Sequence, residues 1–179
     1  MKPRALVVGP LPPPPGGVGR LVEAILASPL AARWQLDVFD LSKPQQEGRP
    51  STVTAWDVAW TLVHLVTLPL RLIVRRPRVA LVQSTADTGF VRDTALVLVL
   101  RAFAVPVVLH WHGAPESPQF PGPSPEGWRA ALFRFGTRRA RRVIVLAEPY
   151  RPFFEHHIPA ARLRVVPNFV DGARIRGGG

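Results

Sequence analysis

A loop rich in glycine and proline follows the first apolar run of the chain. It has the sequence GPLPPPPGGVGR at residues 9–20 and lies directly before an amphipathic segment. Glycines let backbone N–H groups come close to an anion, and a helix N-terminus adds partial positive charge. The spacing fits neither the dinucleotide fingerprint nor a P-loop. Two interpretations of the loop therefore stay open, a phosphate-binding loop and a turn that feeds a helix.

Two histidines lie near the end of a second apolar run, VVLHWHG at residues 107–113. Alternation along a strand would place His110 and His112 on the same side. At the strand end His112 could enter a cleft and contact a substrate hydroxyl, while Gly113 lets the chain turn away. The alternative is a structural pair beside a helix cap. Because no group of carboxylates accompanies them, we expect no metal site.

Runs of Val, Leu and Ile alternate with amphipathic segments, and this order must position both features. The expected strands are residues 5–8, 34–41, 79–83, 107–111, 143–146 and 163–166. The expected helices are residues 18–26, 56–75, 90–104, 125–139 and 150–157. Such alternation predicts an α/β domain with a doubly wound parallel sheet covered on both faces. Ligands bind at the carboxyl ends of strands in such sheets, which directs attention to residues 10–19, 84–89, 110–113 and 147–148.

Composition bounds the class of protein. The 179 residues carry 23 Lys+Arg and 12 Asp+Glu, a net charge of +11, and are 47% hydrophobic. That is one domain with a sizeable core rather than a disordered chain. The lack of cysteine excludes a disulfide scaffold and thiol catalysis. All the cations except Lys2 and Lys43 are arginines, which favours anionic partners such as nucleotide phosphates, acidic lipids or nucleic acid.

Export and membrane signals are weak in the sequence. The first apolar run has four residues, which is short of a signal sequence. The apolar stretch between Asp57 and Arg71, residues 58–70, has thirteen residues without a charge, whereas a membrane span needs about 20. We therefore expect a cytoplasmic protein, soluble or peripheral at the inner face of the membrane.

Five segments in chain order match one known family. They are the glycine loop at residues 16–19, LIVRRPRVALVQ at 72–83, HG at 112–113, RRVIVLAE at 141–148 and PAARLRVVPNFVD at 159–171. Over residues 6–171 the chain resembles the N-terminal, acceptor-side domain of GT-B fold glycosyltransferases of family 4. That group is retaining and uses nucleotide sugars. The resemblance implies a Rossmann-like domain over residues 1–171, one half of a GT-B architecture, and a disordered glycine-rich tail at 172–179.

The resemblance also implies roles for single residues. The loop over the donor phosphate, which also shapes the acceptor pocket, would contain Gly16, Gly17, Gly19 and Arg20. His112 would be the catalytic residue that contacts the donor sugar near the reacting carbon, and Asn168 would begin the interdomain hinge. No cofactor is implied beyond the nucleotide sugar as substrate, and no metal is required.

Three positions depart from the family pattern. Phe169 stands where the hinge has glycine, and Ala147 stands where serine usually precedes Glu148. A run of four prolines at residues 12–15 stiffens the approach to the glycine loop.

A second domain follows the PNxVD segment in the family and holds most of the nucleotide sugar. It supplies a basic pair on the diphosphate and the carboxylates of an E-x7-E motif. Here the sequence ends eight residues after Asp171. We therefore expect the donor domain to be absent and the isolated chain to be inactive, either as a fragment or as one subunit whose partner brings that domain.

The segment at residues 56–75 combines tryptophan, apolar residues and arginine. An interfacial helix uses this combination on anionic lipid, and its contacts would be Trp56, Trp60, Arg71, Arg75 and Arg76. In the alternative interpretation, a helix that is apolar nearly all round simply packs on the sheet. A second basic run at residues 129–142 could follow nucleic-acid phosphates, but no reader motif accompanies it, and such a run is usually a solvated helix face.

These observations favour one function and leave two alternatives. The leading hypothesis is an acceptor-side glycosyltransferase domain that moves a sugar from a nucleotide-sugar donor to a lipid-linked or polysaccharide acceptor of the cell envelope. Its expected partners are the donor, the acceptor, a donor domain or partner chain, and an anionic membrane surface. The second hypothesis is a non-catalytic binding or docking subunit. A nucleic-acid-binding domain is the least favoured.

Overall fold

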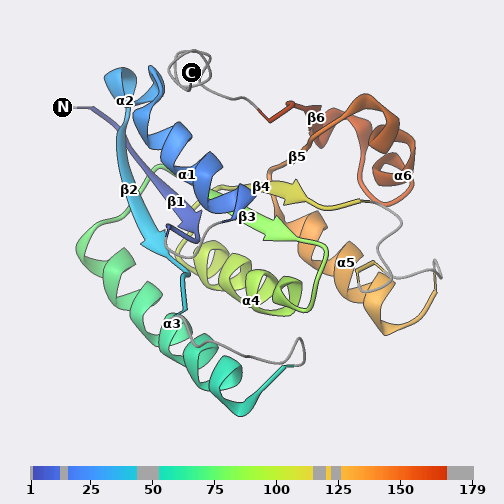
Figure 1. Cartoon of the computed structure of the whole chain (residues 1–179), viewed down its shortest axis with the longest axis horizontal. Coiled ribbons are helices and arrows are strands. Elements are labelled where there is room, and N and C mark those ends of the chain that lie inside the picture. Colours follow the sequence, from blue (N-terminus) through green and yellow to red (C-terminus); the bar gives the residue numbers. More distant parts are fainter. Residues whose placement is uncertain (1, 13–15, 44–52, 115–119, 122–125, 169–179) are drawn as a thin grey trace, which may run out of the picture.

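The computed structural model describes residues 2–12, 16–43, 53–114, 120–121 and 126–168. Strands and helices alternate along these ranges (Figure 1). The strands are β1 (Arg4–Gly9), β2 (Gln35–Asp40), β3 (Val79–Thr85), β4 (Val107–His112), β5 (Arg142–Val145) and β6 (Leu163–Val165). The helices are α1 (Gly17–Ala27), α2 (Leu30–Arg33), α3 (Ala55–Val74), α4 (Gly89–Ala102), α5 (Trp128–Arg139) and α6 (Arg151–Glu155). Two 3-10 turns, η1 (Glu148–Tyr150) and η2 (Ala160–Arg162), flank α6.

All six strands pair in parallel in the order β2-β1-β3-β4-β5-β6. From β1 the chain first moves outward to β2, then crosses back over β1 to β3 and continues in the other direction. The strand order therefore reverses between β1 and β3, as the prediction of a doubly wound sheet requires. That prediction is confirmed, and the reversal leaves a crevice at the carboxyl ends of β1 and β3.

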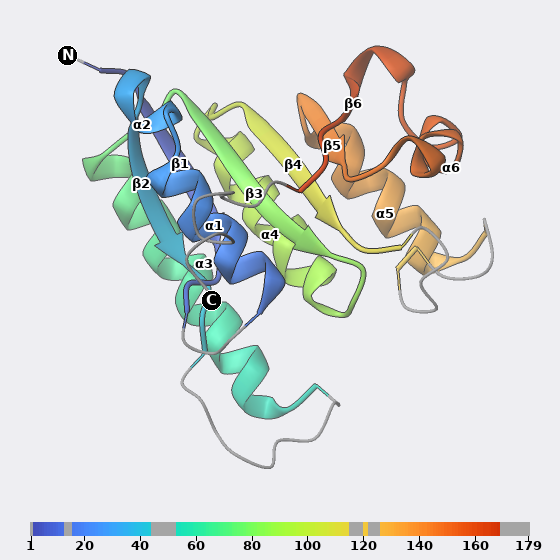
Figure 2. The same cartoon turned by 45° about the horizontal axis from the view of Figure 1, so that its top comes forward.

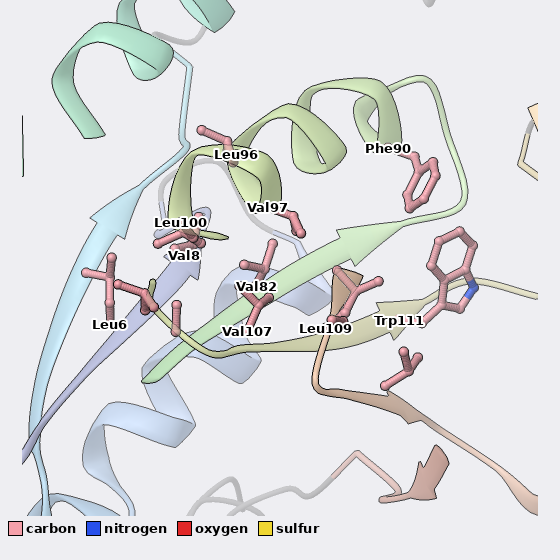
Figure 3. Close-up of a cluster of buried hydrophobic side chains, with 14 of the residues drawn as sticks. Leu6, Val8, Val82, Phe90, Leu96, Val97, Leu100, Val107, Leu109 and Trp111 are labelled. Carbon is pink, nitrogen blue, oxygen red and sulfur yellow. The ribbon is translucent and has the colours of Figure 1, made fainter. Parts of the chain in front are cut away.

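The two faces of the sheet are covered unequally. The larger core includes Val82 and Leu109 from the strands, together with residues of α3, α4, α5 and α6. Figure 3 shows Phe90 of α4 facing Trp111 of β4 in this core. The opposite face holds a smaller cluster, in which α1 packs Leu21, Val22 and Ile25 against Val7. Figure 2 shows α1 and α4 on opposite sides of the sheet.

Helix α3 begins at a capping box. The Thr54 side chain accepts a hydrogen bond from the Asp57 backbone N–H, and Thr54 N–H donates to Asp57 Oδ2 at 2.8 Å. Lys43 Nζ donates to Asp57 Oδ1 at 2.6 Å. That bond, with those from Thr54, holds the pKa of Asp57 well below its usual range. The ion pair ties the residues that follow β2 to the first turn of α3.

The structure corrects two boundaries. Helix α5 begins at Trp128 instead of residue 125, because Gly127 has φ +97°, a left-handed conformation that cannot continue a helix upstream. Pro125 lies outside the described residues. The helix expected at residues 150–157 is divided into η1 and the five-residue α6. The short α2 and η2 were not predicted, because three or four residues show no hydrophobic period.

Phe133 on α5 offers a test of the larger core. Its ring lies fully buried, with its centroid 5.2 Å from that of Trp111 and 5.7 Å from that of Phe154. Phe133→Leu should lower the free energy of unfolding by about 1–3 kcal/mol, because a buried cavity replaces aromatic contacts. Urea denaturation measures this. Phe135→Leu, on the same helix but 39% exposed, is the control and should change stability by less than about 0.5 kcal/mol.

Candidate functional site

A pocket of about 340 Å³ lies at the reversal of strand order. Its walls come from the β1–α1 loop, the residues that follow β2, the end of β3 and the start of α4. Gln83, Lys43 and Arg92 are the polar residues in it that have the longest reach. The pocket therefore occupies the place where open parallel sheets bind their ligands.

His112 is linked to this pocket through Gln83. Its Nε2 lies 2.6 Å from Gln83 Oε1, and because an amide oxygen only accepts, the imidazole donates. The β3–β4 register places Thr85 opposite His112 and Gln83 opposite His110. Burial lowers the pKa of His112 to about 4, so the ring is neutral at pH 7. With Nε2 protonated, Nδ1 is a hydrogen-bond acceptor.

His110 lies on the same side of β4 as His112, as strand alternation predicts. The two ring centroids are 4.2 Å apart. Burial, and to a lesser degree His112, lowers the pKa of His110 to about 3. Within the described ranges, His110 Nε2 has no hydrogen-bond partner, and no group of three or more His, Asp or Glu residues could hold a metal ion. That the protein needs no metal stays a prediction.

Gln83 is a site residue that the sequence analysis did not select. The residue is buried, and its Nε2 has no partner among the described residues although it belongs to a pocket wall. A methyl group at Gly9 would come within 2.8 Å of Gln83 Cγ, so the glycine that ends β1 makes room for this side chain. The available signal was a polar residue that interrupts an otherwise apolar strand at its carboxyl end.

Arg92 is held at the opposite wall by a buried acid. Its guanidinium donates to Asp93 Oδ1 at 2.9 and 3.1 Å, and Ser84 Oγ donates to Asp93 Oδ2 at 2.9 Å. Asp93 is fully buried, and this burial raises the pKa of its carboxyl. Lys43 is fixed in the same pocket by Asp57. Two oriented cations thus face one cavity, which the sequence spacing did not reveal.

The predicted glycine loop precedes α1 as expected. Gly16 and Gly17 are exposed, and a methyl group on either would meet no atom within 4 Å. Gly19 is buried against Pro12, with 3.5 Å to its Cδ, and Arg20 is exposed in the first turn. A methyl group at Gly19 would make only ordinary contact with Pro12, so packing does not require glycine at any of the three positions, and among the described residues nothing crowds Gly16 and Gly17 at the N-terminus of α1.

The turn after His112 depends on Gly113. A methyl group there would lie 2.3 Å from Ala86 Cβ, in the connection between β3 and α4. The close approach of these two strand ends requires a residue without a side chain. The fold therefore requires glycine at position 113, next to the site residue His112.

The other predicted site residues lie apart from this pocket. Asn168 is exposed after β6, while Phe169 and the tail at residues 172–179 lie outside the described residues. Trp56 is 43% exposed. The Trp60 indole N–H donates to the Ser42 carbonyl at 3.1 Å, and the Arg71 guanidinium donates to the Val38 carbonyl. Arg75 and Arg76 are exposed.

The second basic run is in part occupied by local contacts. Arg139 Cζ lies 3.3 Å from the centre of the Phe135 ring, and the Arg138 carbonyl accepts from Arg162. These contacts fit a solvated helix face.

The lowered pKa of His112 predicts a pH-dependent stability. In the unfolded chain histidine titrates near 6.5, so that state binds more protons than the folded state as the pH falls below about 6.5. The free energy of unfolding should therefore decrease from there toward pH 4, the folded pKa of His112. Urea denaturation at pH 7 and pH 5 should show a smaller decrease for His112→Gln than for the unchanged protein.

Above about pH 7.5 the His112→Gln protein and the unchanged protein should differ by a nearly constant amount, because nearly all of the imidazole is neutral in both states there. An equal decrease in both proteins from pH 7 to pH 5 would contradict a half-buried imidazole that stays neutral in the folded state.

Three solved structures share this fold. UDP-N-acetylglucosamine 2-epimerase from Rickettsia bellii has TM-score 0.59 and 11% identity, and covers 94% of this chain and 45% of its own. MurG from Acinetobacter baumannii has TM-score 0.55 and 10% identity, and the match covers 99% of this chain and 49% of MurG. UGT73P12 from Glycyrrhiza uralensis, complexed with glycyrrhetinic acid 3-O-monoglucuronide, has TM-score 0.53 and 8% identity. That match covers 93% of this chain and 48% of UGT73P12.

The chain therefore spans about half the length of each of these structures, and at such identities the likeness concerns the fold alone. It confirms the expected fold class, a Rossmann-like sheet matching one half of a GT-B architecture.

Sequence comparison identifies the family. No curated protein sequence matches the chain. The model of Glycosyltransferase Family 4 matches residues 15–174, a range that contains both histidines, the pocket residues Gln83 and Arg92, and the glycine loop. Since this match extends over most of the chain, the protein belongs to glycosyltransferase family 4.

Proposed function

We propose that this chain is the acceptor-side domain of a retaining glycosyltransferase that uses a nucleotide sugar. One observation carries the proposal. In a chain of glycosyltransferase family 4, the carboxyl-end crevice contains a neutral His112 hydrogen-bonded to a buried Gln83, beside a pocket with two oriented cations. One of the similar structures is an epimerase of UDP-N-acetylglucosamine, a nucleotide sugar, which supports a ligand of this class.

In the proposed reaction the bond between the sugar C1 and the diphosphate oxygen breaks, and the electron pair leaves with the nucleoside diphosphate. The acceptor oxygen bonds to C1 on the same face of the sugar, and its proton passes to the leaving diphosphate. A neutral His112 supplies a hydrogen-bond acceptor at Nδ1 for a sugar hydroxyl near C1. It adds no charge, so the charge on the leaving group must be balanced by other groups.

The N-terminus of α1 suits the phosphate end of the donor. Its cap residue Gly16 has extended backbone and no side-chain capping bond, and no atom of the described residues lies within 4 Å of a methyl group built on Gly16 or Gly17. Unpaired N–H groups in the first turn, with the helix dipole, favour an anion at this position. Arg20 in the same turn adds a positive charge.

The remaining groups would come from a second domain. The chain spans about half the length of the similar solved structures. We propose that a donor domain, in the same polypeptide or in a partner chain, provides the charges on the diphosphate. Transfer would then need both parts and no metal, and it would take place on the cytoplasmic side of the membrane.

The pocket itself would hold the acceptor. Arg92 and Lys43 are hydrogen-bond donors with positive charge, and the buried Gln83 Nε2 is a donor without a partner among the described residues. These three groups fit an acceptor that presents oxygen atoms, including an anionic group such as phosphate or carboxylate. A lipid-linked or polysaccharide acceptor of the cell envelope would meet this requirement.

His112 is the first residue to test. In the complete enzyme, His112→Ala should lower kcat by about 100-fold, because a hydrogen bond to the reacting sugar is lost in the transition state. Release of nucleoside diphosphate measures turnover. His156→Ala, which changes an exposed histidine between α6 and β6, is the matched control and should keep full activity. Unchanged turnover in His112→Ala would remove His112 from the site.

Arg92 tests the acceptor pocket separately. Arg92→Met should raise KM for the acceptor by about tenfold or more with a smaller change in kcat, since one charge-assisted hydrogen bond is worth about 1.5–3 kcal/mol. Arg101→Met on the exposed side of the same helix is the control. Thermal denaturation checks that both variants fold. Equal KM values for the two variants would contradict the role of Arg92.

A further inference from the structure

The apolar face of α3 points away from the protein. The helix packs on the sheet through His64, Leu68 and Leu72, its buried residues. Six apolar side chains on the other side are each more than half exposed, and we call them the outer face of α3: Val58, Leu62, Val66, Leu70, Ile73 and Val74. Their spacing of three and four residues forms a continuous stripe along the helix. Figure 1 shows α3 at the margin of the molecule.

The two charged residues of α3 and its histidine have the opposite orientation. Asp57 is bound by Thr54 and Lys43, and the Arg71 guanidinium reaches the Val38 carbonyl of β2. His64 is buried between the rings of Phe39 and Trp60. A helix on a protein surface in water has charged residues outside and apolar residues inside. Helix α3 is therefore built for an apolar environment on its outer side.

Packing on the sheet does not account for this composition. In the 18-residue apolar window of α3, only 17% of the residues are buried. By length and composition the helix could also cross a membrane, because its two charged residues are few enough over 20 residues. The packing interpretation therefore accounts for the buried side of α3, and the exposed side needs another explanation. Since Leu68 and Leu72 hold α3 on the sheet, the helix lies along the domain with one side uncovered.

A cluster of cations follows the outer face directly. Arg75 and Arg76 come immediately after Val74, and both are exposed together with Arg78. Arg76 and Arg78 line a hollow of about 1180 Å³ at the amino ends of β1 and β2, together with Lys2 and Arg4. Among the described residues, no Asp or Glu lines this hollow. An apolar stripe therefore ends in a group of positive charges that have no acidic neighbour in the hollow.

Tryptophan marks the opposite end of the helix. The rings of Trp56 and Trp60 stack at 6.0 Å between centroids, and Trp56 is 43% exposed. Indole rings favour the boundary between lipid and water.

We propose that the outer face of α3 docks on an anionic lipid bilayer. The apolar stripe enters the boundary between headgroups and acyl chains, and Arg75, Arg76 and Arg78 contact lipid phosphates. Charge decides between this surface and a second copy of the chain. Two copies joined face to face would leave both cation clusters without acids, whereas an anionic bilayer presents phosphate directly above its apolar layer.

This docking has a consequence for the acceptor, which rests on the proposed function. Lys43 lines the acceptor pocket and is paired with Asp57 in the first turn of α3. A bilayer along α3 would therefore lie beside one wall of that pocket. An acceptor anchored in the same membrane could reach the pocket without leaving the bilayer.

Co-sedimentation with lipid vesicles tests the docking. The full chain should bind phosphatidylcholine vesicles that contain one quarter phosphatidylglycerol at least tenfold better than pure phosphatidylcholine. The variant Leu62→Gln/Val66→Gln/Leu70→Gln should lose at least tenfold in binding to the anionic vesicles. Its exposed control, Trp128→Gln/Phe135→Gln on α5, should bind like the unchanged protein.

The cations are tested at constant net charge. Arg75→Gln/Arg76→Gln/Arg78→Gln should weaken binding to anionic vesicles by on the order of 100-fold, since each arginine near such a surface is worth about 1 kcal/mol. Arg138→Gln/Arg139→Gln/Arg141→Gln removes the same charge elsewhere and should bind far better. An equal loss of vesicle binding in both variants would mean that only the net charge of the protein matters. That result would contradict docking through the outer face of α3.

Two further results would also contradict the proposal. One is equal binding of the apolar variant and the unchanged protein. The other is a dimer in analytical ultracentrifugation that the apolar variant dissociates while vesicle binding is absent, which would assign the face to a second copy. Circular dichroism unfolding checks that each variant is folded. Because none of these measurements uses glycosyl transfer, their failure leaves the proposed function untouched.

Discussion

The reversal of strand order between β1 and β3 is the constraint on which the candidate site depends. Parallel strands that share a direction place all their carboxyl ends at one edge, and the reversal prevents a single helix from covering that edge. The space that results contains the end of β3 with Gln83 and the starts of α1 and α4. Gly9 and Gly113 lack side chains where these ends approach one another most closely.

Within this edge, buried polar groups set the chemistry. His110 and His112 lose their ordinary basicity because burial disfavours the charged ring. Arg92 stays oriented because a fully buried carboxylate accepts from it and from Ser84. The site therefore combines neutral hydrogen-bonding groups on the sheet with fixed cations at its rim. Such an arrangement suits a polar, anionic ligand better than an apolar one.

The same sheet explains why α3 is unusual. Its crossover from β2 to β3 lies beside α4 and β2, where Leu68 and Leu72 are buried in the larger core. Its charged residues point inward, where Asp57 pairs with Lys43 and Arg71 donates to the Val38 carbonyl, so the apolar side remains uncovered. The result is a solvent-exposed apolar surface beside a hollow that is lined with cations.

The sequence alone determined the order of elements, the sheet class and the positions of both histidines, because local hydrophobic periodicity and glycine placement encode them. Only the tertiary structure decided that Gln83 meets His112 and that Arg92 and Lys43 face one pocket. It also decided that α3 exposes an apolar side and turns its charged residues toward the protein. Those contacts join strands and helices distant in the chain, and periodicity cannot state which side of an apolar helix meets the sheet. Gly127 shows the same limit locally, since its left-handed φ, not its neighbours' helix propensity, sets the start of α5.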